Sequence, residues 1–437
     1  MINVGIIGFG TVGTGTAKIL LENNVVIEEK TGLQINLQSI ADLDTERDRG
    51  VKIPEGILTR EVSDVIDNPD IHIVVELMGG IQPAKDFILR ALNNGKHVVT
   101  ANKALLATEG KEIFEAAEKN SVSVGLEAAV AGGIPIIKVL KEGLVANRIL
   151  SIYGIINGTS NYILTKMTED GIDFSDALKE ARSLGYAEAD PTLDIEGFDT
   201  AHKLTIISSL AFGIPLSYEK IHIEGITRLT LQDIEFAGEL GYKIKLLAIT
   251  KSVNGEVELR VHPTMIPENY LISRVDGVLN AVYVMGDAVG ETLYYGRGAG
   301  DMPTGSAVVS DIVDIAGDIR NNGVSSLGTD FIGKRSDLKI KAIGDIESMY
   351  YFRFTALDRP GVLSRISGIL GDYNIGIAAV IQKGRRAGAA VPLVVLTHKA
   401  RERDVQKALQ EIDRLDVVAD RTAFIRVEGE ETEGFND

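Results

Sequence analysis

The chain has 437 residues, and its 62 acidic against 45 basic residues give a formal net charge of −17. No lysine- and arginine-rich run interleaved with aromatic residues is present, so we expect no nucleic-acid partner. Cysteine is absent, which excludes disulfides, thiolate metal ligands and a cysteine nucleophile. Apolar runs are shorter than a membrane span, and a strand-like run follows Met1 without a leader, so we expect a cytoplasmic protein with no membrane segment.

The amino-terminal residues predict a nucleotide-binding turn. An apolar run at 2–7 is followed by G-F-G-T-V-G and then by a helix to about Leu21. Glycines in this motif allow a tight turn, close approach of the backbone to a pyrophosphate and close packing of helix on strand. With a strand before it and a helix after it, the motif favours dinucleotide binding over a structural turn. The predicted cofactor-binding residues are Gly8, Phe9, Gly10, Thr11, Val12 and Gly13.

Further strands are predicted at 35–41, 71–77, 97–100 and 122–126, separated by helices or loops. This alternation is typical of an α/β domain with a Rossmann-type, doubly wound parallel sheet. We assign residues 1–130 to this dinucleotide-binding domain.

Asp42 ends the second predicted strand, where an acidic side chain would bind the ribose hydroxyls of NAD. Three basic residues that follow could instead accept the extra phosphate of NADP, or could be solvated loop charges: Arg47, Arg49 and Lys52. The choice between NAD and NADP therefore stays open. Thr100 and Lys103 follow a strand at the carboxyl edge of the sheet, where such sheets bind ligands; Lys103 could equally be a lysine at the start of the next helix.

The segment from Gly185 to Lys203 combines five carboxylates with one lysine. Such a cluster repels itself, so it is expected around a cation, an ammonium-bearing ligand or a catalytic proton. A helix is predicted after Gly197 and ends at Gly213, and it places Asp199 and Lys203 on one face. Pro191 is expected to keep the upstream part in a loop. The alternative is a solvated surface pair between Asp199 and Lys203.

Three motifs give a resemblance to a known family. N-G-T-S-N-Y-I from Asn157, Y-A-E-A-D-P from Tyr186 and G-F-D-T-A-H-K from Gly197 closely resemble the homoserine dehydrogenases, over roughly residues 1–330. The resemblance implies reversible, nicotinamide-dependent reduction of L-aspartate 4-semialdehyde to L-homoserine, a step toward threonine, methionine and isoleucine. It also implies an α+β catalytic and dimerisation domain at 131–304, and a homodimer or homotetramer.

The resemblance assigns roles to the residues of the acidic segment. Lys203 is implied to be the proton donor in reduction, with Asp199 orienting it and Lys103 beside the nicotinamide. Glu188 and Asp194 are implied to hold the substrate ammonium, and Tyr186 to line the pocket.

Two glycine-containing loops also resemble parts of the family. Residues 127–134 resemble a sodium-binding loop, in which the metal ligands would be the backbone carbonyls of Glu127, Val130, Gly132 and Ile134; without the family this is a helix-entry turn. Gly298 and Gly300 are implied to close over the cofactor before a helix that returns, at about 305–325, to the nucleotide domain; a flexible interdomain connection is the alternative.

The carboxyl-terminal part is predicted to be a separate unit. A linker is expected at 326–347, followed at 348–428 by strands at 350–356, 375–382, 391–397 and 423–427 and by two helices. This βαββαβ order is that of a ferredoxin-like fold. The tail at 429–437 is acidic and expected to be disordered.

L-D-R-P-G-V-L-S-R-I and N-I-G-I in this unit resemble an ACT domain. The resemblance implies an amino-acid effector at Asp358, Pro360 and Gly361, facing Asn374, with feedback by threonine as the natural hypothesis. A dimerisation module without a ligand is the alternative.

Other functions are weighed against this one. An aspartate semialdehyde dehydrogenase would need a cysteine, which the chain lacks, and a fused aspartate kinase is not expected, because the nucleotide fold begins at residue 2. Another amino-acid-pathway dehydrogenase of the same fold remains an alternative. An amino-acid-binding regulator without catalysis would be expected to lack Lys103, Asp199 or Lys203, and all three are present.

Overall fold

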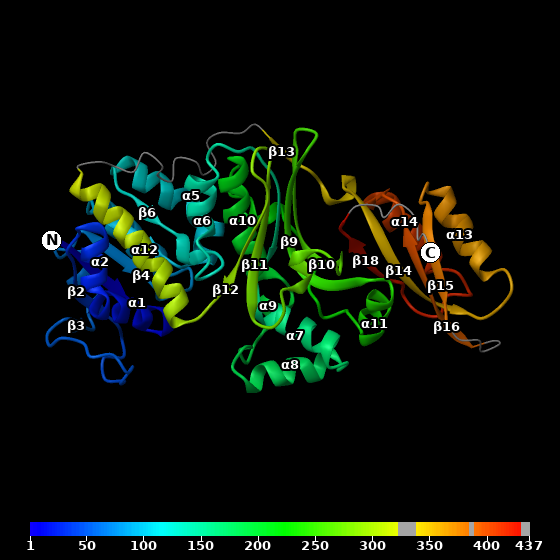
Figure 1. Cartoon of the computed structure of the whole chain (residues 1–437), viewed down its shortest axis with the longest axis horizontal. Coiled ribbons are helices and arrows are strands. Elements are labelled where there is room, and N and C mark those ends of the chain that lie inside the picture. The colour runs from blue at the N-terminus through cyan, green and yellow to red at the C-terminus, as the bar shows by residue number, and fades with distance from the viewer. Residues whose placement is uncertain (322–337, 384–388, 430–437) are drawn as a thin grey trace.

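A computed structural model describes residues 1–321, 338–383 and 389–429. The molecule is elongated, and Figure 1 shows three units in a row: the amino-terminal unit (blue and cyan, with the yellow α12), the middle unit (mainly green) and the carboxyl-terminal unit (orange to red). Within the described ranges, no helix has the length and apolar character needed to cross a bilayer.

The amino-terminal unit is built on a six-stranded parallel sheet with the order β3-β2-β1-β4-β5-β6. This confirms the predicted Rossmann-type sheet. The strands are β1 (Ile2–Ile7), β2 (Ile35–Ala41), β3 (Leu58–Thr59), β4 (Ile73–Glu76), β5 (His97–Thr100) and β6 (Val124–Gly125). The short edge strand β3 was not predicted, and the strands predicted at 71–77 and 122–126 are shorter than expected.

Helices cover both faces of this sheet. They are α1 (Thr11–Glu22), α2 (Asn24–Thr31), α3 (Ser63–Ile66), α4 (Ala84–Asn93), α5 (Lys103–Lys119) and, from later in the chain, α12 (Asp301–Arg320). Ile6 and Val75 pack toward α1 and α12, whereas Ile7 and Val74 pack toward α3, α4 and α5. Alternate side chains of the buried strands thus face opposite helical layers.

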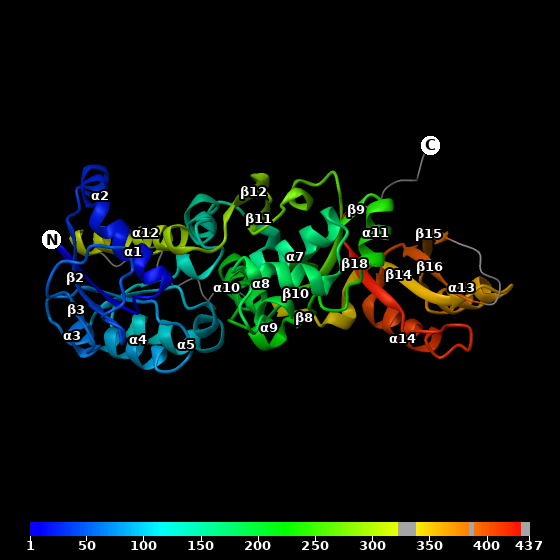
Figure 2. The same cartoon turned by 90° about the horizontal axis from the view of Figure 1, so that it is seen from below.

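Helix α12 lies along α1, as both views show (Figures 1 and 2). The contact is close because glycines meet there: a Cβ on Gly15 would lie 2.2 Å from the Asp301 carbonyl oxygen, and one on Gly305 would lie 2.8 Å from the Gly15 carbonyl carbon. The sequence predicted that this helix returns to the nucleotide-binding unit, and it does so through close packing of the α12 backbone on the α1 backbone.

The middle unit carries five long strands in the order β12-β11-β7-β9-β10. Adjacent strands are antiparallel. They are β7 (Ile149–Ile155), β9 (Tyr242–Val253), β10 (Glu256–Pro267), β11 (Leu279–Gly286) and β12 (Gly290–Arg297). The helical segments of this part are η1 (Glu127–Ala129), α6 (Ile136–Lys138), η2 (Val139–Gly143), α7 (Gly158–Glu169), α8 (Phe174–Ser183), α9 (Thr192–Ile195), α10 (Phe198–Phe212), η3 (Tyr218–Lys220), α11 (Leu231–Glu239) and η4 (Leu271–Arg274). The short strand β8 (His222–Ile223) pairs with β10.

The carboxyl-terminal unit has the predicted βαββαβ order. Its elements are β14 (Glu347–Leu357), α13 (Val362–Asp372), β15 (Ile377–Gln382), β16 (Ala390–Thr397), α14 (Glu402–Ile412) and β18 (Ala423–Val427), with the short β17 (Ala400–Arg401) beside β14. The strand order is β18-β14-β16-β15. Strand β18 also pairs in parallel with β10, so this unit extends the sheet of the middle unit instead of forming an isolated body.

The predicted linker at 326–347 is described only from residue 338. Residues 326–337 lie outside the described residues. From residue 338 the chain is fixed to the middle unit, because β13 (Lys339–Ile340) pairs with β10 before η6 (Ile343–Asp345) leads into β14. In the predicted tail, residues 430–437 also lie outside the described residues.

Candidate active site

The glycine loop between β1 and α1 has the geometry that the motif predicts. Gly8 has φ +96°, which favours glycine, and a Cβ on Gly13 would lie 2.1 Å from the Gly8 carbonyl oxygen. A Cβ on Gly10 would meet no protein atom within 4 Å. Gly8 and Gly13 are therefore required by the fold, whereas Gly10 leaves open space at the amino end of α1, where a pyrophosphate would fit.

Gly10→Ala and Gly15→Ala are expected to have different effects. Gly10→Ala should leave thermal unfolding of the free protein nearly unchanged but weaken nicotinamide-nucleotide binding at least about tenfold, or about 1.4 kcal/mol, because the new methyl group fills the space for the ligand. Gly15→Ala should destabilise the fold by about 1–3 kcal/mol, because α12 must move. Calorimetric unfolding and nucleotide titration of both variants separate the loss of stability from the loss of binding. Equal unfolding temperatures of the two variants would contradict the predicted difference in stability.

Asp42 lies against the glycine loop. Its Oδ2 accepts a hydrogen bond from the Phe9 amide at 2.6 Å, and its Oδ1 lies 3.4 Å from Arg49 Nη2. Arg49 also stacks over the Phe9 ring, 4.8 Å from the ring centroid. Asp42 thus fixes the loop, and the basic residue nearest to it is Arg49.

The Thr100 side chain helps to fix the backbone between β5 and α5. Its side chain is fully buried; the hydroxyl donates to Glu76 Oε2 at 2.7 Å and accepts from the Asn102 amide at 3.0 Å. The Thr100 hydroxyl is thus engaged within the protein, and the cofactor contact predicted for Thr100 stays a prediction. Asn102 in turn caps α5 by accepting from the Leu105 amide, which fixes the helix start that carries Lys103.

Two lysines from different units converge on one carboxylate. Lys203 Nζ lies 2.6 Å from Asp199 Oδ2 and 2.7 Å from the Ile156 carbonyl oxygen, and Lys103 Nζ lies 3.2 Å from Asp199 Oδ1. Asp199 and Lys203 are one turn apart on α10 and are buried, whereas the Lys103 side chain is 43% exposed. A solvated surface pair between Asp199 and Lys203 is thereby excluded. Lys103 is the member of the cluster that solvent reaches.

The electrostatics differ between the two lysines. Burial lowers the pKa of Lys203, although the Asp199 charge opposes this shift. The Asp199 charge raises the pKa of Lys103. Burial opposes ionisation of Asp199, but the two lysine charges outweigh it and lower the pKa of that carboxyl group. An ammonium that is easier to deprotonate than a normal lysine is suited to proton transfer.

Asp194 belongs to the same cluster through Asn157, which was not among the predicted site residues. Asn157 Nδ2 donates to Asp194 Oδ1 at 2.7 Å and to Asp199 Oδ2 at 3.0 Å, while its Oδ1 accepts from the Ser160 amide as the cap of α7. Burial raises the pKa of Asp194. The signal available in the sequence was the position of Asn157, between the end of a strand and the start of a helix.

The remaining predicted substrate residues lie at the rim. Glu188 and Tyr186 are exposed. The Glu188 charge contributes to the raised pKa of Lys103. The Tyr186 ring packs against Tyr162, with centroids 5.0 Å apart. The predicted loop upstream of α10 is wrong in one respect, because Pro191 caps the one-turn helix α9, which carries Asp194.

The predicted cation loop adjoins the second glycine loop. A Cβ on Gly132 would lie 2.4 Å from the Gly298 carbonyl oxygen, and one on Gly298 would lie 1.8 Å from Asn280 Nδ2. Gly300 has φ +122°. Packing or backbone conformation thus requires glycine at these positions. The cofactor contact of Gly298 and Gly300 stays a prediction.

Two carbonyls predicted to bind the cation also accept backbone hydrogen bonds: the Glu127 carbonyl from the Val130 amide at 3.3 Å and the Ile134 carbonyl from the Ile136 amide at 2.8 Å. The Glu127 carboxylate accepts from the Ile137 and Lys138 amides. Among the described residues, no three His, Cys, Asp or Glu side chains group as metal ligands. A sodium ion held by backbone carbonyls remains a prediction.

The predicted effector residues do not face one another within one chain. Asp358, Pro360 and Gly361 precede α13, whereas Asn374 follows it. At 1.5 Å per residue, the 11 residues of this helix separate them by about 16 Å. Within one chain these residues therefore do not meet, and an effector site that they form between paired ACT domains stays a prediction.

Comparison with known proteins agrees with this site. Residues 8–127 match the NAD-binding domain of homoserine dehydrogenase, 135–313 match homoserine dehydrogenase and 350–417 match the ACT domain. A homoserine dehydrogenase of Neisseria gonorrhoeae is 48% identical over 430 residues (98% of each chain), and that of Bacillus subtilis is 39% identical over 431 (98% of each). The crystal structure of a homoserine dehydrogenase from Thiobacillus denitrificans has 49% identity and a TM-score of 0.92, covering 98% of each chain. The chain therefore belongs to the homoserine dehydrogenases, a family of NAD(P)-dependent oxidoreductases, and carries a carboxyl-terminal ACT domain.

Proposed function

We propose that this protein catalyses the reversible reduction of L-aspartate 4-semialdehyde to L-homoserine. The observation that carries the proposal is the meeting of Lys103 and Lys203 on Asp199, at distances of 3.2 and 2.6 Å. The two lysines come from the nucleotide-binding and middle units, so the cluster lies where a nucleotide and a small substrate would meet. A regulator without catalysis would have no need for such a cluster.

The chain's own residues have distinct tasks in this reaction. A nicotinamide cofactor held at the loop of residues 8–13 would supply the hydride chemistry at the aldehyde carbon. Lys203 donates a proton to the carbonyl oxygen as the alcohol forms and takes it back in the reverse direction. Asp199 holds the Lys203 ammonium in place, and Lys103 orients the same oxygen from the open side.

The acidic residues recognise the other end of the substrate. Asp194 and Glu188 provide negative charge for the α-ammonium group, and Tyr186 lines the rim. Asn157 holds Asp194 and Asp199 at a fixed separation, so it acts as a positioning residue.

Asn157→Ser is expected to lower kcat/KM for aspartate semialdehyde by about 10- to 100-fold. A hydrogen bond to a charged group contributes about 1.5–3 kcal/mol, and serine cannot reach both carboxylates. Serine still caps a helix, so thermal unfolding should change little. Steady-state kinetics and a melting curve check this. A loss of unfolding temperature in proportion to the loss of activity would indicate a purely structural role.

The finer properties are part of the same proposal. NAD or NADP is held by the loop at 8–13 and by Gly298 and Gly300, a sodium ion is held by carbonyls of 127–134, and threonine acts as feedback inhibitor through the ACT domain. The reaction serves the synthesis of threonine, methionine and isoleucine in the cytoplasm. The proposed domains are the dinucleotide-binding domain at 1–130 with about 305–325, the catalytic domain at 131–304 and the ACT domain at 348–428.

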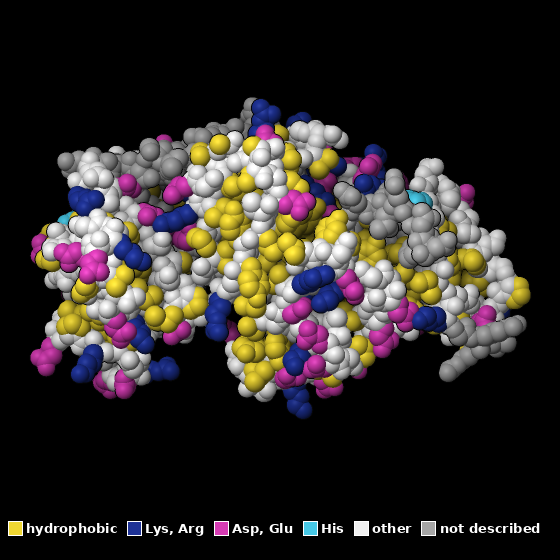
Figure 3. All heavy atoms as spheres, in the orientation of Figure 1, with side chains coloured by type: hydrophobic (Ala, Val, Ile, Leu, Met, Phe, Trp, Pro, Cys, Tyr) yellow, Lys and Arg dark blue, Asp and Glu magenta, His cyan; other side chains and the backbone are white. Residues whose placement is uncertain are grey.

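A homodimer or homotetramer is also proposed. Apolar side chains form a broad band across the middle unit in Figure 3. Exposed apolar residues of this unit include Leu271, Val289 and Tyr295, which are 68%, 45% and 58% exposed. Apolar surface of this kind is typical of an interface.

The test follows NADH and NADPH absorbance with aspartate semialdehyde as substrate, with and without sodium, while threonine, methionine and lysine are titrated. Turnover with one or both nucleotides is expected. Absence of turnover with either nucleotide in a folded preparation would overturn the proposed reaction, whereas turnover without any inhibition would overturn only the feedback.

A further inference from the structure

A buried carboxylate that the proposed reaction does not use lies at the nucleotide crevice. Glu76 is the last residue of β4 and is fully buried. In the sheet register it lies opposite Ile7 of β1 and Thr100 of β5. The strand order reverses between β1 and β4, and sheets of this kind bind dinucleotides in the crevice at that point. Glu76 is therefore placed at the crevice.

The Glu76 carboxylate is bonded only by donors. Its Oε1 accepts from the Met78 amide at 2.9 Å and from the Gly79 amide at 3.2 Å, and its Oε2 accepts from the Thr100 hydroxyl at 2.7 Å. Three donors are the pattern of an ionised carboxylate. Among the residues that the structure describes, no lysine, arginine or histidine forms an ion pair with it. The domain thus holds a negative charge without a cationic partner.

One layer of backbone separates this charge from the crevice. The two amides that bind Oε1 belong to the loop after β4, in which Met78 is 40% exposed and Gly79 is also exposed. The loop adjoins the glycine turn after β1, because a Cβ on Gly8 would lie 2.7 Å from the Met78 nitrogen. The Glu76 charge thus lies directly behind a surface that a bound nucleotide would contact.

The second carboxylate oxygen connects Glu76 to the segment that carries Lys103. The Thr100 hydroxyl, which donates to Oε2, accepts from the Asn102 amide at 3.0 Å. Asn102 Nδ2 in turn donates to the Gly80 carbonyl at 2.6 Å. The loop after β4 and the turn before α5 are thereby joined by a continuous set of hydrogen bonds that includes Glu76. Both edges of the crevice keep their positions through this carboxylate.

The proposed reaction creates a need for negative charge near the nicotinamide. When the reduced cofactor gives up its hydride, the nicotinamide ring becomes cationic. In that reaction the ring lies close to the substrate oxygen, which Lys103 and Lys203 approach. The Asp199 carboxylate contacts both ammonium groups and balances one of the two charges. A further anion on the nucleotide-binding side offsets the remaining repulsion.

We propose that Glu76 is a positioning residue whose buried charge favours binding of the oxidised, cationic nicotinamide over the reduced form. Glu76 acts through the backbone of the loop after β4 and does not touch the cofactor. The proposal rests on the proposed function for the cations that surround the ring. Its effect on nucleotide binding does not require turnover.

The test compares Glu76→Gln with the parent protein by titration calorimetry, with NAD⁺ and NADH and with NADP⁺ and NADPH. Both forms of each pair carry the same pyrophosphate and ribose groups, so the ratio of their dissociation constants reports on the ring. Glutamine has nearly the shape of glutamate but no charge. Glu76→Gln is expected to weaken the oxidised form at least about fivefold relative to the reduced form. A merely structural role would weaken both forms equally.

Two further variants serve as controls. Glu76→Asp keeps the charge but shortens its reach to the loop, so it should weaken both forms by similar factors and preserve their ratio. Glu61→Gln removes an exposed charge of the same unit and should change neither dissociation constant. If Glu76→Gln does not fold, Met78→Lys replaces it as the test, because a cation on the exposed side of the same loop should also weaken the oxidised form relative to the reduced form.

An unchanged ratio in Glu76→Gln would overturn the proposal, and so would the same change of ratio in Glu76→Asp. If Glu76→Gln does not fold, an unchanged ratio in Met78→Lys has that meaning. A shifted ratio in a protein that does not reduce aspartate semialdehyde would refute the proposed reaction and leave the role of Glu76 standing. Normal turnover with an unchanged ratio would refute only the role of Glu76.

Discussion

Lys203→Ala is expected to reduce kcat for aspartate semialdehyde reduction by roughly 10²- to 10⁴-fold, the usual contribution of a positioned general acid. The Lys203 ammonium is held by Asp199 and the Ile156 carbonyl at 2.6 and 2.7 Å, and alanine has no group that can donate a proton in its place. In the proposed function other residues bind the substrate ammonium, so KM should change much less than kcat. Steady-state and single-turnover kinetics in the reducing direction measure the effect.

The matched control is Lys245→Met. Lys245 is also buried, and its Nζ lies 2.7 Å from both Asp276 Oδ1 and the Val275 carbonyl oxygen, but it does not contact the lysine cluster. This variant should lose stability and keep kcat for the fraction that remains folded. Ordinary turnover in Lys203→Ala, or an equal loss in both variants, would remove Lys203 as proton donor.

Much of the fold could be predicted because its signals are local. β2 and β5 have the predicted bounds, and α10 ends at Gly213, which adopts the left-handed conformation of a helix cap. The ACT domain follows its predicted order because each strand and helix has its own period of apolar residues. The edge strand β3 has two residues, too few for any period.

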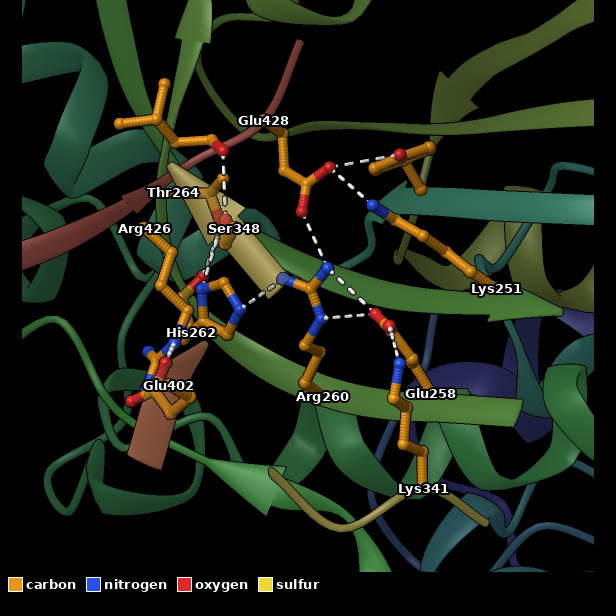
Figure 4. A network of polar contacts seen from close by, with 12 residues as sticks. Lys251, Glu258, Arg260, His262, Thr264, Lys341, Ser348, Glu402, Arg426 and Glu428 are labelled. Carbon is orange, nitrogen blue, oxygen red and sulfur yellow. Dashed lines mark hydrogen bonds and ion pairs between the residues drawn. The ribbon is translucent and has the colours of Figure 1, made fainter. Parts of the chain in front are cut away.

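Long-range burial could not be predicted. Strand β10 carries Glu258, Arg260, His262 and Thr264 at alternate positions, a pattern that indicates a solvent-facing side, yet all four are buried. Figure 4 shows why: Arg260 lies between Glu258 and Glu428, and Lys251 contacts Glu428 from β9. Glu428 is 168 positions from Arg260, and local sequence contains no sign of that meeting.

The candidate site also contains one part that local sequence predicted and another part that it could not predict. Spacing of four residues predicted the Asp199–Lys203 pair. Lys103 was a candidate on its strand-end position, but its contact with Asp199 depends on the packing of α5 against α10, and the bridge through Asn157 depends on α7. The family resemblance supplied the roles, whereas the geometry came from contacts between segments that are far apart in the sequence.

The buried charges at β10 and β18 also explain why the ACT domain is attached as it is. Arg260, Arg426 and Glu428 would be costly to bury unpaired. Glu428 meets Lys251 and Arg260, and Arg426 meets Glu224, only when β18 lies beside β10. The network therefore fixes the register between the two units.

Asp199→Asn is expected to lower kcat by a large factor and to shift its pH dependence. In reduction Lys203 must be protonated, so activity is lost as the pH rises through the pKa of Lys203. Burial already lowers that pKa, and the Asp199 charge opposes the shift. Removing the charge lowers the pKa further, so the basic limb of the kcat profile must move to lower pH. Asp194→Asn is the control: it should raise KM for aspartate semialdehyde and move the limb much less, because Asp199 contributes more to Lys203 than Asp194 does. A basic limb that stays in place in Asp199→Asn would mean that another group supplies the proton.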